Sequence, residues 1–248
     1  MSDVFVKTQP GAAADFFSAE ANGLDLLRVA GGPPLPAVRQ VDDDRIVLDR
    51  IEPGAACETA AREFGRRLAT MHTTWLPCLG AAAPGYVGTL PLDNTTSDDW
   101  PTFYAERRLR PYLHGLDKEV RDAVDRVIDR LHDLAGPPEP PARIHGDLWS
   151  GNLLWAADGQ VWLVDAASAH GGHRETDLAM LALFGAPHLD VIMSAYQEAA
   201  PLADGWRERV PLHQLHPLLV HAQLFGGHYN QSVIHQANAA LSPSTGAR

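Results

Sequence analysis

The chain of 248 residues has few cysteines, few basic residues and no long apolar run. Its two cysteines, Cys57 and Cys78, lack metal-ligand spacing and are too few for a disulfide framework, so a reducing compartment is expected. No segment has the roughly 18 consecutive apolar residues of a membrane span, and none resembles a signal peptide. We therefore expect a cytoplasmic protein with no membrane partner.

The charge balance excludes another class of partner. The chain has 31 acidic and 20 basic residues, which gives a formal net charge of -11. This is the wrong sign for a protein that neutralises nucleic-acid phosphates. With 45% hydrophobic residues the chain can form a real core, either in one large domain or in two smaller lobes.

Strand and helix patterns divide the sequence near residue 52. Residues 3–8 alternate as a short strand, residues 12–30 have helical spacing, and residues 45–51 are typical of a buried strand ended by Pro53 and Gly54. Helical periodicity dominates afterwards, as at 57–72 and 118–136. We expect a small β-containing lobe at 1–52 and a mainly helical lobe at 53–248.

Within the helical part, residues 153–165 predict a β-hairpin that turns at Asp158 and Gly159. Residues near 153 would then lie opposite residues near 163, so that Asn152 and Asp165 leave the same open end. Asp147 lies just upstream, in a loop tied to that end. Two carboxylates and one amide oxygen suit Mg²⁺, and a spare carboxylate beside the metal can accept a hydroxyl proton. Turn capping is the alternative explanation for these polar residues.

The spacing favours the chemical interpretation. His145, Asp147 and Asn152 form the pattern H-x-D-x-x-x-x-N, and Asp165 follows 13 residues later at a strand end. This order and approximate spacing are those of a kinase catalytic loop and its metal-binding aspartate.

Four sequence blocks resemble the fructosamine (ketosamine) kinase family, within the aminoglycoside phosphotransferase and choline kinase-like group. They are "WPTFYAERRLRPYL", "IHGDLWSGN", "LVDAASAHGGHRETDLAMLALFG" and "LLVHAQLFGGHYNQ", in that order along most of the chain from Tyr86 to Ala237. The resemblance implies a bilobal α+β fold of the protein-kinase-like type, with ATP and Mg²⁺. It also implies phosphorylation of a sugar hydroxyl on a ketosamine, either a small molecule or protein-bound, as in protein deglycation.

The resemblance also assigns roles to residues. Asp147 matches the catalytic base, and Asn152 and Asp165 match the metal ligands. Lys7 matches the strand lysine that holds the ATP phosphates, and Glu20 matches its helix partner. Four residues match the hinge that receives adenine: Val47, Leu48, Asp49 and Ile51. Charge attraction independently supports pairing of Lys7 with Glu20, the only glutamate of its helix, although both could also be unpaired surface residues.

One departure concerns the start of the chain. In the family, a glycine-containing hairpin that covers the nucleotide phosphates precedes the strand lysine, and here only six residues precede Lys7. We therefore expect a truncated amino-terminal lobe, with an exposed sheet edge.

The remaining candidates lie close to the motif. Trp149 could stack on a sugar ring or support the loop. His173 and Glu175 follow two glycines in a flexible loop and are predicted to contact substrate rather than a metal. Asp177 is expected to cap a helix and, with His145, to support the catalytic loop.

Two other functions stay open. One is a small-molecule kinase for an aminoglycoside or choline-type alcohol, which would use the same metal centre. The other is a catalytically impaired pseudokinase, suggested by the missing phosphate hairpin. The choice between monomer and dimer is also open.

Overall fold

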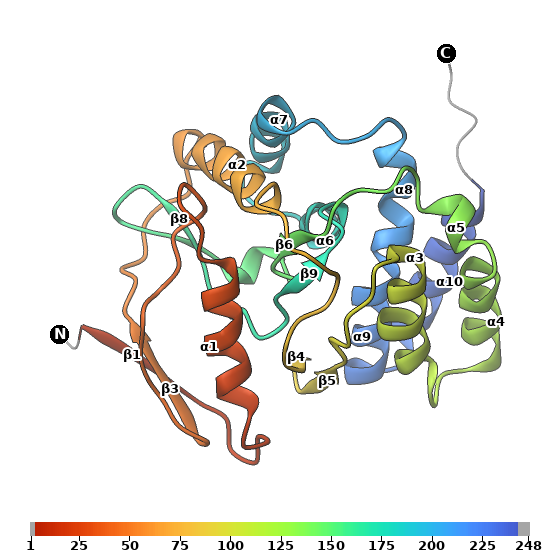
Figure 1. Ribbon diagram of the computed structural model, residues 1–248, viewed down its shortest axis with the longest axis horizontal. Coiled ribbons are helices and arrows are strands. Elements are labelled where there is room, and N and C mark those ends of the chain that lie inside the picture. Colours follow the sequence, from red (N-terminus) through yellow and green to blue (C-terminus); the bar gives the residue numbers. More distant parts are fainter. Residues whose placement is uncertain (1–2, 243–248) are drawn as a thin grey trace.

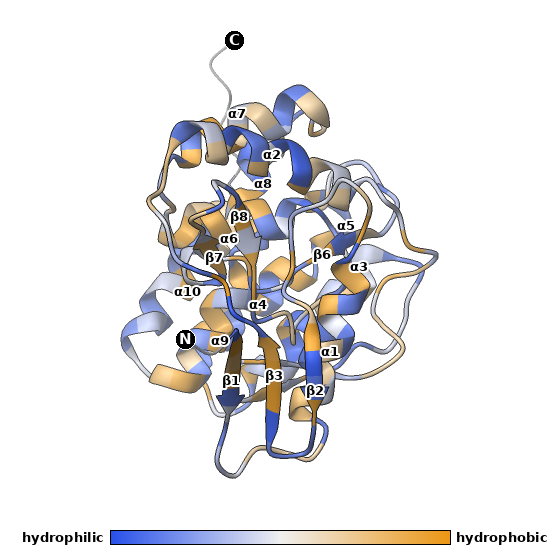
Figure 2. Ribbon diagram, turned by 90° about the vertical axis from the view of Figure 1, so that its left-hand side faces the viewer, coloured by the Kyte–Doolittle hydropathy of each residue, from blue (hydrophilic) through white to orange (hydrophobic). Residues whose placement is uncertain are grey.

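A computed structural model describes residues 3–242, and its amino-terminal end is a small antiparallel sheet with one helix beside it. Its strands β1 (Val4–Thr8), β2 (Val38–Val41) and β3 (Arg45–Asp49) lie in the order β1-β3-β2, which makes β1 an edge strand (Figure 2). Lys7 of β1 is paired with Ile46 of β3. The helix buries one face, including Phe17, Glu20 and Leu24, in agreement with its sequence periodicity. This helix is α1 (Phe16–Leu27).

Helices and short two-stranded ribbons make up the rest of the described chain, and the kinase-like α+β class expected from the sequence is confirmed. The helices furthest along the chain lie at the end opposite the sheet (Figure 1). The first of these elements are α2 (Glu58–His72), β4 (Gly85–Val87), β5 (Leu90–Leu92), α3 (Trp100–Phe103), a π-helix (Tyr104–Leu109), a 3-10 helix (Arg110–Leu113), α4 (Lys118–Ile128) and α5 (Leu131–Leu134). They continue with β6 (Ala142–Ile144), a 3-10 turn (Ser150–Asn152), β7 (Leu153–Trp155), β8 (Val161–Leu163), β9 (His170–Gly172), α6 (Glu175–Phe184), α7 (Leu189–Ala199), α8 (Trp206–His213), α9 (Leu215–Phe225) and α10 (His228–Leu241).

One predicted helix is interrupted. The pattern over 118–136 is divided into α4 and α5, because Arg130 leaves the helical conformation with φ -115° and ψ 10°. The break between α9 and α10 is at a glycine. Gly226 has φ +83°, a backbone conformation that glycine adopts without a steric penalty.

Two apolar clusters form the core. The first joins α1 and β3 to α2, α7 and the β7–β8 ribbon, with Phe17, Phe64, Leu163 and Tyr196 among its members. The second lies among α4, α8, α9, α10 and the helical segment near Tyr104. The first cluster therefore packs residues from both sides of residue 52 against one another. The lobe boundary at that residue stays a prediction, and the ends of the two predicted lobes, at 1–2 and 243–248, lie outside the described residues.

Between residues 3 and 242, no helix is both long enough and apolar enough to cross a membrane.

Gly23 brings α1 against the segment that follows Asp165. A Cβ atom at this position would overlap the carbonyl oxygen of Ala166, and backbone cannot move aside as a flexible side chain can. We expect Gly23→Ala to lower the free energy of unfolding by about 1–3 kcal/mol, the usual cost of overpacking. Urea unfolding measures this change.

The matched control is Gly227→Ala. Gly227 has φ -56° and open space where a Cβ would be placed, so this variant should unfold within about 0.5 kcal/mol of the parent. Equal midpoints for the two variants would contradict the close contact between α1 and Ala166.

Candidate active site

The predicted hairpin is present and places two of the candidate metal ligands at its open end. Leu153 of β7 pairs with Leu163 of β8, as expected. Just beyond this pair, the backbone N–H of Val164 donates to the carbonyl oxygen of Asn152 at 3.2 Å. Asp165 therefore follows directly from a residue that is hydrogen-bonded to Asn152. At the other end, Asp158 accepts hydrogen bonds from Gln160 and Trp162 and so stabilises the turn.

Asn152 also contacts the catalytic loop. Its Nδ2 donates to the backbone oxygen of Asp147 at 2.8 Å and to Oδ2 of Asp147 at 3.2 Å. The same side chain is 5% exposed, so these bonds fix its orientation. The amide oxygen of Asn152 is then available as a ligand. The structure thus brings Asp147, Asn152 and Asp165 together, as the hairpin geometry predicted.

Asp177 stabilises the backbone of the catalytic loop through hydrogen bonds. Its completely buried carboxylate accepts hydrogen bonds from the backbone N–H groups of His145 at 2.7 Å and Gly146 at 2.9 Å. His145 in turn contacts the carbonyl oxygen of Val164 through Nε2 at 2.9 Å. The prediction that Asp177 caps a helix is wrong, because α6 already begins at Glu175 and the carboxylate is bonded to the loop.

Lys7 lies between two carboxylates. Its Nζ is 2.8 Å from Oε2 of Glu20 and 2.6 Å from Oδ1 of Asp165. The pair with Glu20 was expected from the sequence, and the contact with Asp165 joins the sheet to the hairpin. Burial opposes the charged form of Lys7, but the charges of Asp165 and Glu20 outweigh it and raise the pKa of the ammonium group.

Asp147 has the electrostatic character of a proton acceptor. Burial, together with the nearby charge of Asp165, raises the pKa of Asp147 to about 6, against the opposing effects of His145 and Asn152. A carboxylate with such a pKa accepts a proton more readily than an ordinary aspartate does, while it is still ionised at neutral pH. Asp165 itself has φ +61°, one of two positive values among non-glycine residues of the described chain. Backbone strain of this kind is frequent at functional sites.

A cavity of about 520 Å³ lies beside Lys7 and Asp165. Its lining includes Leu48, Asp49 and Ile51 of the predicted hinge, together with Glu20 and Asn152. The Asp49 carboxylate is paired with Arg39 and its backbone N–H donates to the carbonyl oxygen of Ala37, so the part of Asp49 that remains for a ligand is its own carbonyl oxygen. This volume is within the roughly 300–1,000 Å³ of small-molecule pockets.

Val47 is the hinge residue that the structure places elsewhere. It lies in the middle of β3, opposite Val6 and Gln40, and does not line the cavity. The physical reason is the pleat, because neighbouring residues of a strand point to opposite faces and Leu48 already points to the cavity. Phe5 and Arg50 line it instead. Phe5 and Lys7 are two residues apart on β1, so their side chains point to the same face of the sheet. This spacing could have identified Phe5 as a cavity residue from the sequence alone.

Trp149 is an exposed residue of the catalytic loop. Its side chain is 41% exposed, its six-membered ring lies over Gly151, and it meets the ring of Phe184 edge-on at 6.4 Å between centroids. It does not line the cavity of 520 Å³. Stacking of Trp149 on a sugar stays a prediction.

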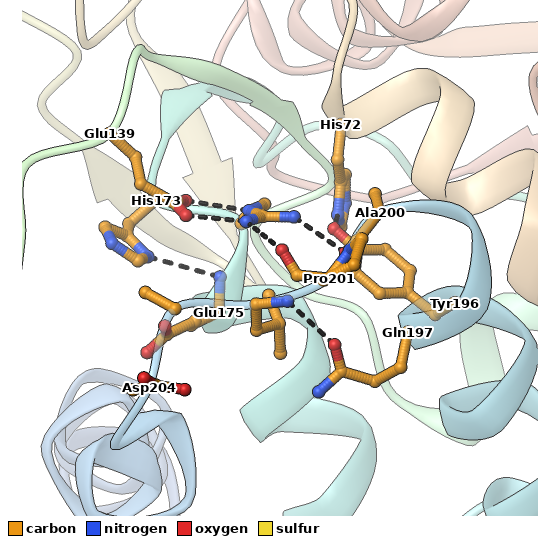
Figure 3. A network of polar contacts seen from close by, with 12 residues as sticks. His72, Glu139, His173, Glu175, Tyr196, Gln197, Ala200, Pro201 and Asp204 are labelled. Atoms are coloured by element: carbon orange, nitrogen blue, oxygen red, sulfur yellow. Dashed lines mark hydrogen bonds and ion pairs between the residues drawn. The ribbon is translucent and has the colours of Figure 1, made fainter.

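The prediction that Glu175 contacts substrate is wrong, because its carboxylate is buried and bonded to protein partners. Substrate contact by His173, which is buried but lines a cavity of about 240 Å³, stays a prediction. Both carboxylate oxygens of Glu175 accept hydrogen bonds from Arg209, at 2.6 and 2.9 Å, and His213 is 3.3 Å away. Burial opposes ionisation of Glu175, but the nearby His213 and the hydrogen bonds from Arg209 lower its pKa to about 2. Figure 3 shows a contact between His173 and Glu175, in which the ring of His173 accepts a hydrogen bond from the backbone N–H of Glu175.

His173, Glu175 and His213 have ligand atoms close enough for a metal ion. The guanidinium of Arg209 takes both oxygens of Glu175, however, which leaves no free anionic ligand for a cation. Burial lowers the pKa of His173 to about 3, and its neutral ring packs beside Trp100 and His213.

Known proteins share both the sequence and the fold. The fructosamine kinase family model matches residues 1–242. The chain belongs to the fructosamine kinase family. It is 34% identical to YniA of Escherichia coli, assigned as a ketoamine kinase, over 92% of this chain and 81% of that protein. A crystal structure from Thermobifida fusca, assigned as a fructosamine-3-kinase, is 50% identical, with a TM-score of 0.91 over 96% of this chain and 85% of that one.

More distantly related crystal structures share only their fold with this chain. Aminoglycoside phosphotransferase APH(4)-Ia is 16% identical, with a TM-score of 0.63 over 98% of this chain and 86% of that one. This fructosamine kinase family member is therefore a kinase with a protein-kinase-like fold. Membership of a kinase family implies ATP as the phosphoryl donor.

The partly buried Asp147 carboxylate should make stability depend on pH. Since its folded-state pKa is about 6 and its ordinary value is 3.8, the ionised form is disfavoured in the folded protein, and stability is lost as pH rises from about 4 through 6. Two pKa units correspond to about 3 kcal/mol. In the absence of metal and nucleotide, Asp147→Asn should therefore raise the unfolding free energy by up to this amount at pH 8 and hardly change it at pH 4.

Urea unfolding at several pH values measures this difference. A stabilisation that is the same at pH 4 and pH 8, or a loss of stability at pH 8, would show that Asp147 is not held in an unfavourable charged state.

Proposed function

We propose that this chain transfers the γ-phosphoryl group of ATP to a sugar hydroxyl of a ketosamine, such as fructosyl-lysine or ribulosyl-lysine, free or protein-bound. The observation that carries the proposal is the convergence of Lys7, Asp147, Asn152 and Asp165 within one set of contacts. Phosphoryl transfer needs this combination of a phosphate-binding cation, metal ligands and a proton acceptor. With a protein-bound acceptor, the reaction would contribute to protein deglycation.

ATP is expected to bind in the cavity of 520 Å³. Its apolar lining, which includes Phe5, Leu48 and Ile51, suits a purine, and the backbone near Asp49 can hydrogen-bond the adenine edge. Lys7 lies in the same lining and can contact the phosphates. The ion pair with Glu20 holds the ammonium group of Lys7 beside the carboxylate of Asp165.

The residues present fit Mg²⁺. Asp165 has a half-exposed carboxylate, and Asn152 has an amide oxygen that makes no hydrogen bond to another described residue; both are the hard oxygen ligands that Mg²⁺ prefers. These two residues would hold the ion. Bound Mg²⁺ would supply neutralisation of the negative charge on the nucleotide phosphates.

Asp147 is the proton acceptor in the proposed reaction. As the acceptor oxygen forms its bond to the γ-phosphorus, the bond to the bridging oxygen of ADP breaks, and the hydroxyl proton passes to the Asp147 carboxylate. The products are a phosphate monoester and ADP. Asn152 orients Asp147 for this step through the bond from its Nδ2, and the amides fixed by Asp177 hold the loop.

The lack of available carboxylates at Glu175 and Asp177 favours a ketosamine over a polycationic aminoglycoside. An aminoglycoside needs several carboxylates around it, and Glu175 and Asp177 were the candidates nearest to the motif. Glu175 is bonded to Arg209, and Asp177 to the loop amides, so neither is available to a ligand. Intact Asp147, Asn152 and Asp165 argue against the pseudokinase alternative, because a binding module has no need of all three.

The roles of the two aspartates can be separated by kinetics. Asp147→Asn should lower kcat by about 10²–10⁴-fold with nearly unchanged ATP affinity, because the proton acceptor acts on the alcohol. Asp165→Ala should abolish Mg²⁺-dependent ATP binding in calorimetry. Asp44→Asn, an exposed carboxylate in a turn, is the control and should match the parent. A kcat within about tenfold of the parent for Asp147→Asn would remove its role as base.

The acceptor can be identified with four compounds: fructosyl-lysine, ribulosyl-lysine, kanamycin and choline. We expect phosphorylation of the ketosamines. Trp149→Ala should raise KM for the sugar more than KM for ATP, because the exposed ring lies outside the nucleotide cavity. Phosphorylation of kanamycin or choline, with both ketosamines inert, would overturn the assignment.

A further inference from the structure

A second cavity, of about 220 Å³, adjoins the catalytic loop and has none of the hinge residues in its lining. It shares Lys7 and Asp165 with the nucleotide cavity, so the two meet at the proposed metal and phosphate position. Asp147 lines the second cavity and does not line the first. A group bound there is therefore next to the proton acceptor, and it faces the nucleotide cavity across Lys7 and Asp165.

The outer wall of this cavity is the β4–β5 ribbon, which is tied to the catalytic segment. The backbone N–H of Tyr86 donates to the carbonyl oxygen of Ala167 at 3.0 Å, and Oγ of Ser168 donates to the carbonyl oxygen of Tyr86 at 2.5 Å. The Tyr86 hydroxyl donates to Asp15 at 2.5 Å. The wall is thus fixed both to the segment after Asp165 and to the residue that precedes α1.

Two uncharged polar side chains of the lining have no protein partner. Gln9 follows β1, and Thr89 is in the turn between β4 and β5; both are exposed and line the cavity. Neither side chain makes a hydrogen bond to any residue within 3–242. Each can therefore bond to a ligand without first losing an internal contact, which makes the pair suited to neutral hydroxyl groups.

We propose that this cavity binds the sugar of the acceptor, and that Gln9 and Thr89 determine specificity by hydrogen bonding to its hydroxyl groups. The inference rests on the proposed function. An in-line transfer requires the reacting hydroxyl to lie between Asp147 and the γ-phosphate, and this cavity has both Asp147 and Asp165 in its wall.

Size and charge support a small polyol in this cavity. Its volume is below the roughly 300–1,000 Å³ of pockets for drug-sized ligands. Its carboxylates are Asp147 and Asp165 alone, and the remaining lining is neutral except for Lys7. The hydroxylated end of a ketosamine fits this environment, whereas a polycation would lack counter-charges.

The test uses kinetics with fructosyl-lysine as the acceptor. Thr89→Val and Gln9→Leu should each raise KM for fructosyl-lysine by about threefold to tenfold, the effect of one lost hydrogen bond, and should leave KM for ATP within about twofold. Thr8→Val is the matched control. Thr8 is exposed, directly precedes Gln9 and does not line the cavity, so this variant should behave as the parent.

A labelling experiment gives a readout that does not depend on turnover. In Thr89→Cys, alkylation of the introduced thiol by N-ethylmaleimide, followed by peptide mass spectrometry, should be slowed by fructosyl-lysine and unaffected by ATP alone. The native Cys57, exposed at the start of α2, is the internal reference and should react at an unchanged rate.

The outcomes separate this inference from the function on which it rests. If the parent phosphorylates fructosyl-lysine but the Thr89 and Gln9 variants keep its KM and show no protection, the inference is overturned and the function stands. If the parent leaves both ketosamines unphosphorylated, the function and the inference fail together.

Discussion

The carboxylate of Asp177 is the constraint on which the active site depends. It is completely buried and accepts hydrogen bonds from two consecutive amides of the catalytic loop, at His145 and Gly146. His72 of α2 approaches the same carboxylate at 3.2 Å. A buried charge is tolerated only when hydrogen-bond donors surround it, so the loop must keep the conformation that supplies these amides. One side chain of α6 thereby fixes the backbone from which Asp147 extends.

Lys7 connects the amino-terminal sheet to the β7–β8 hairpin through its contact with Asp165. It is held between Glu20 and Asp165, two like charges that would repel each other without it. The arrangement places a cation where phosphates are expected, but it also concentrates partly buried charges around a backbone with positive φ at Asp165. The surrounding core, rather than the contacts within the site, stabilises this arrangement. This is usual for strained residues at functional sites.

Sequence reasoning succeeded where the signal was local. The turn at Asp158 and Gly159 determines the pairing of Leu153 with Leu163, and this brings Asn152 and Asp165 together. It failed where the partner of a residue is determined by tertiary packing. Glu175 appeared to be a loop residue, but its partner Arg209 is 34 residues away on α8, and no local pattern reveals that helix packing. The β4–β5 ribbon was missed as well, because strands of three residues are too short to show a period.

The two cavities divide the proposed reaction between donor and acceptor. They share Lys7 and Asp165, the groups that act on the phosphates, whereas Asn152 lines one cavity and Asp147 the other. A proton acceptor that faced the nucleotide would favour attack by water on ATP before the sugar arrives. Because Asp147 lines the cavity bounded by Gln9 and Thr89, the proposed base would be next to the alcohol, and the choice of acceptor would depend on neutral side chains rather than on the charged centre.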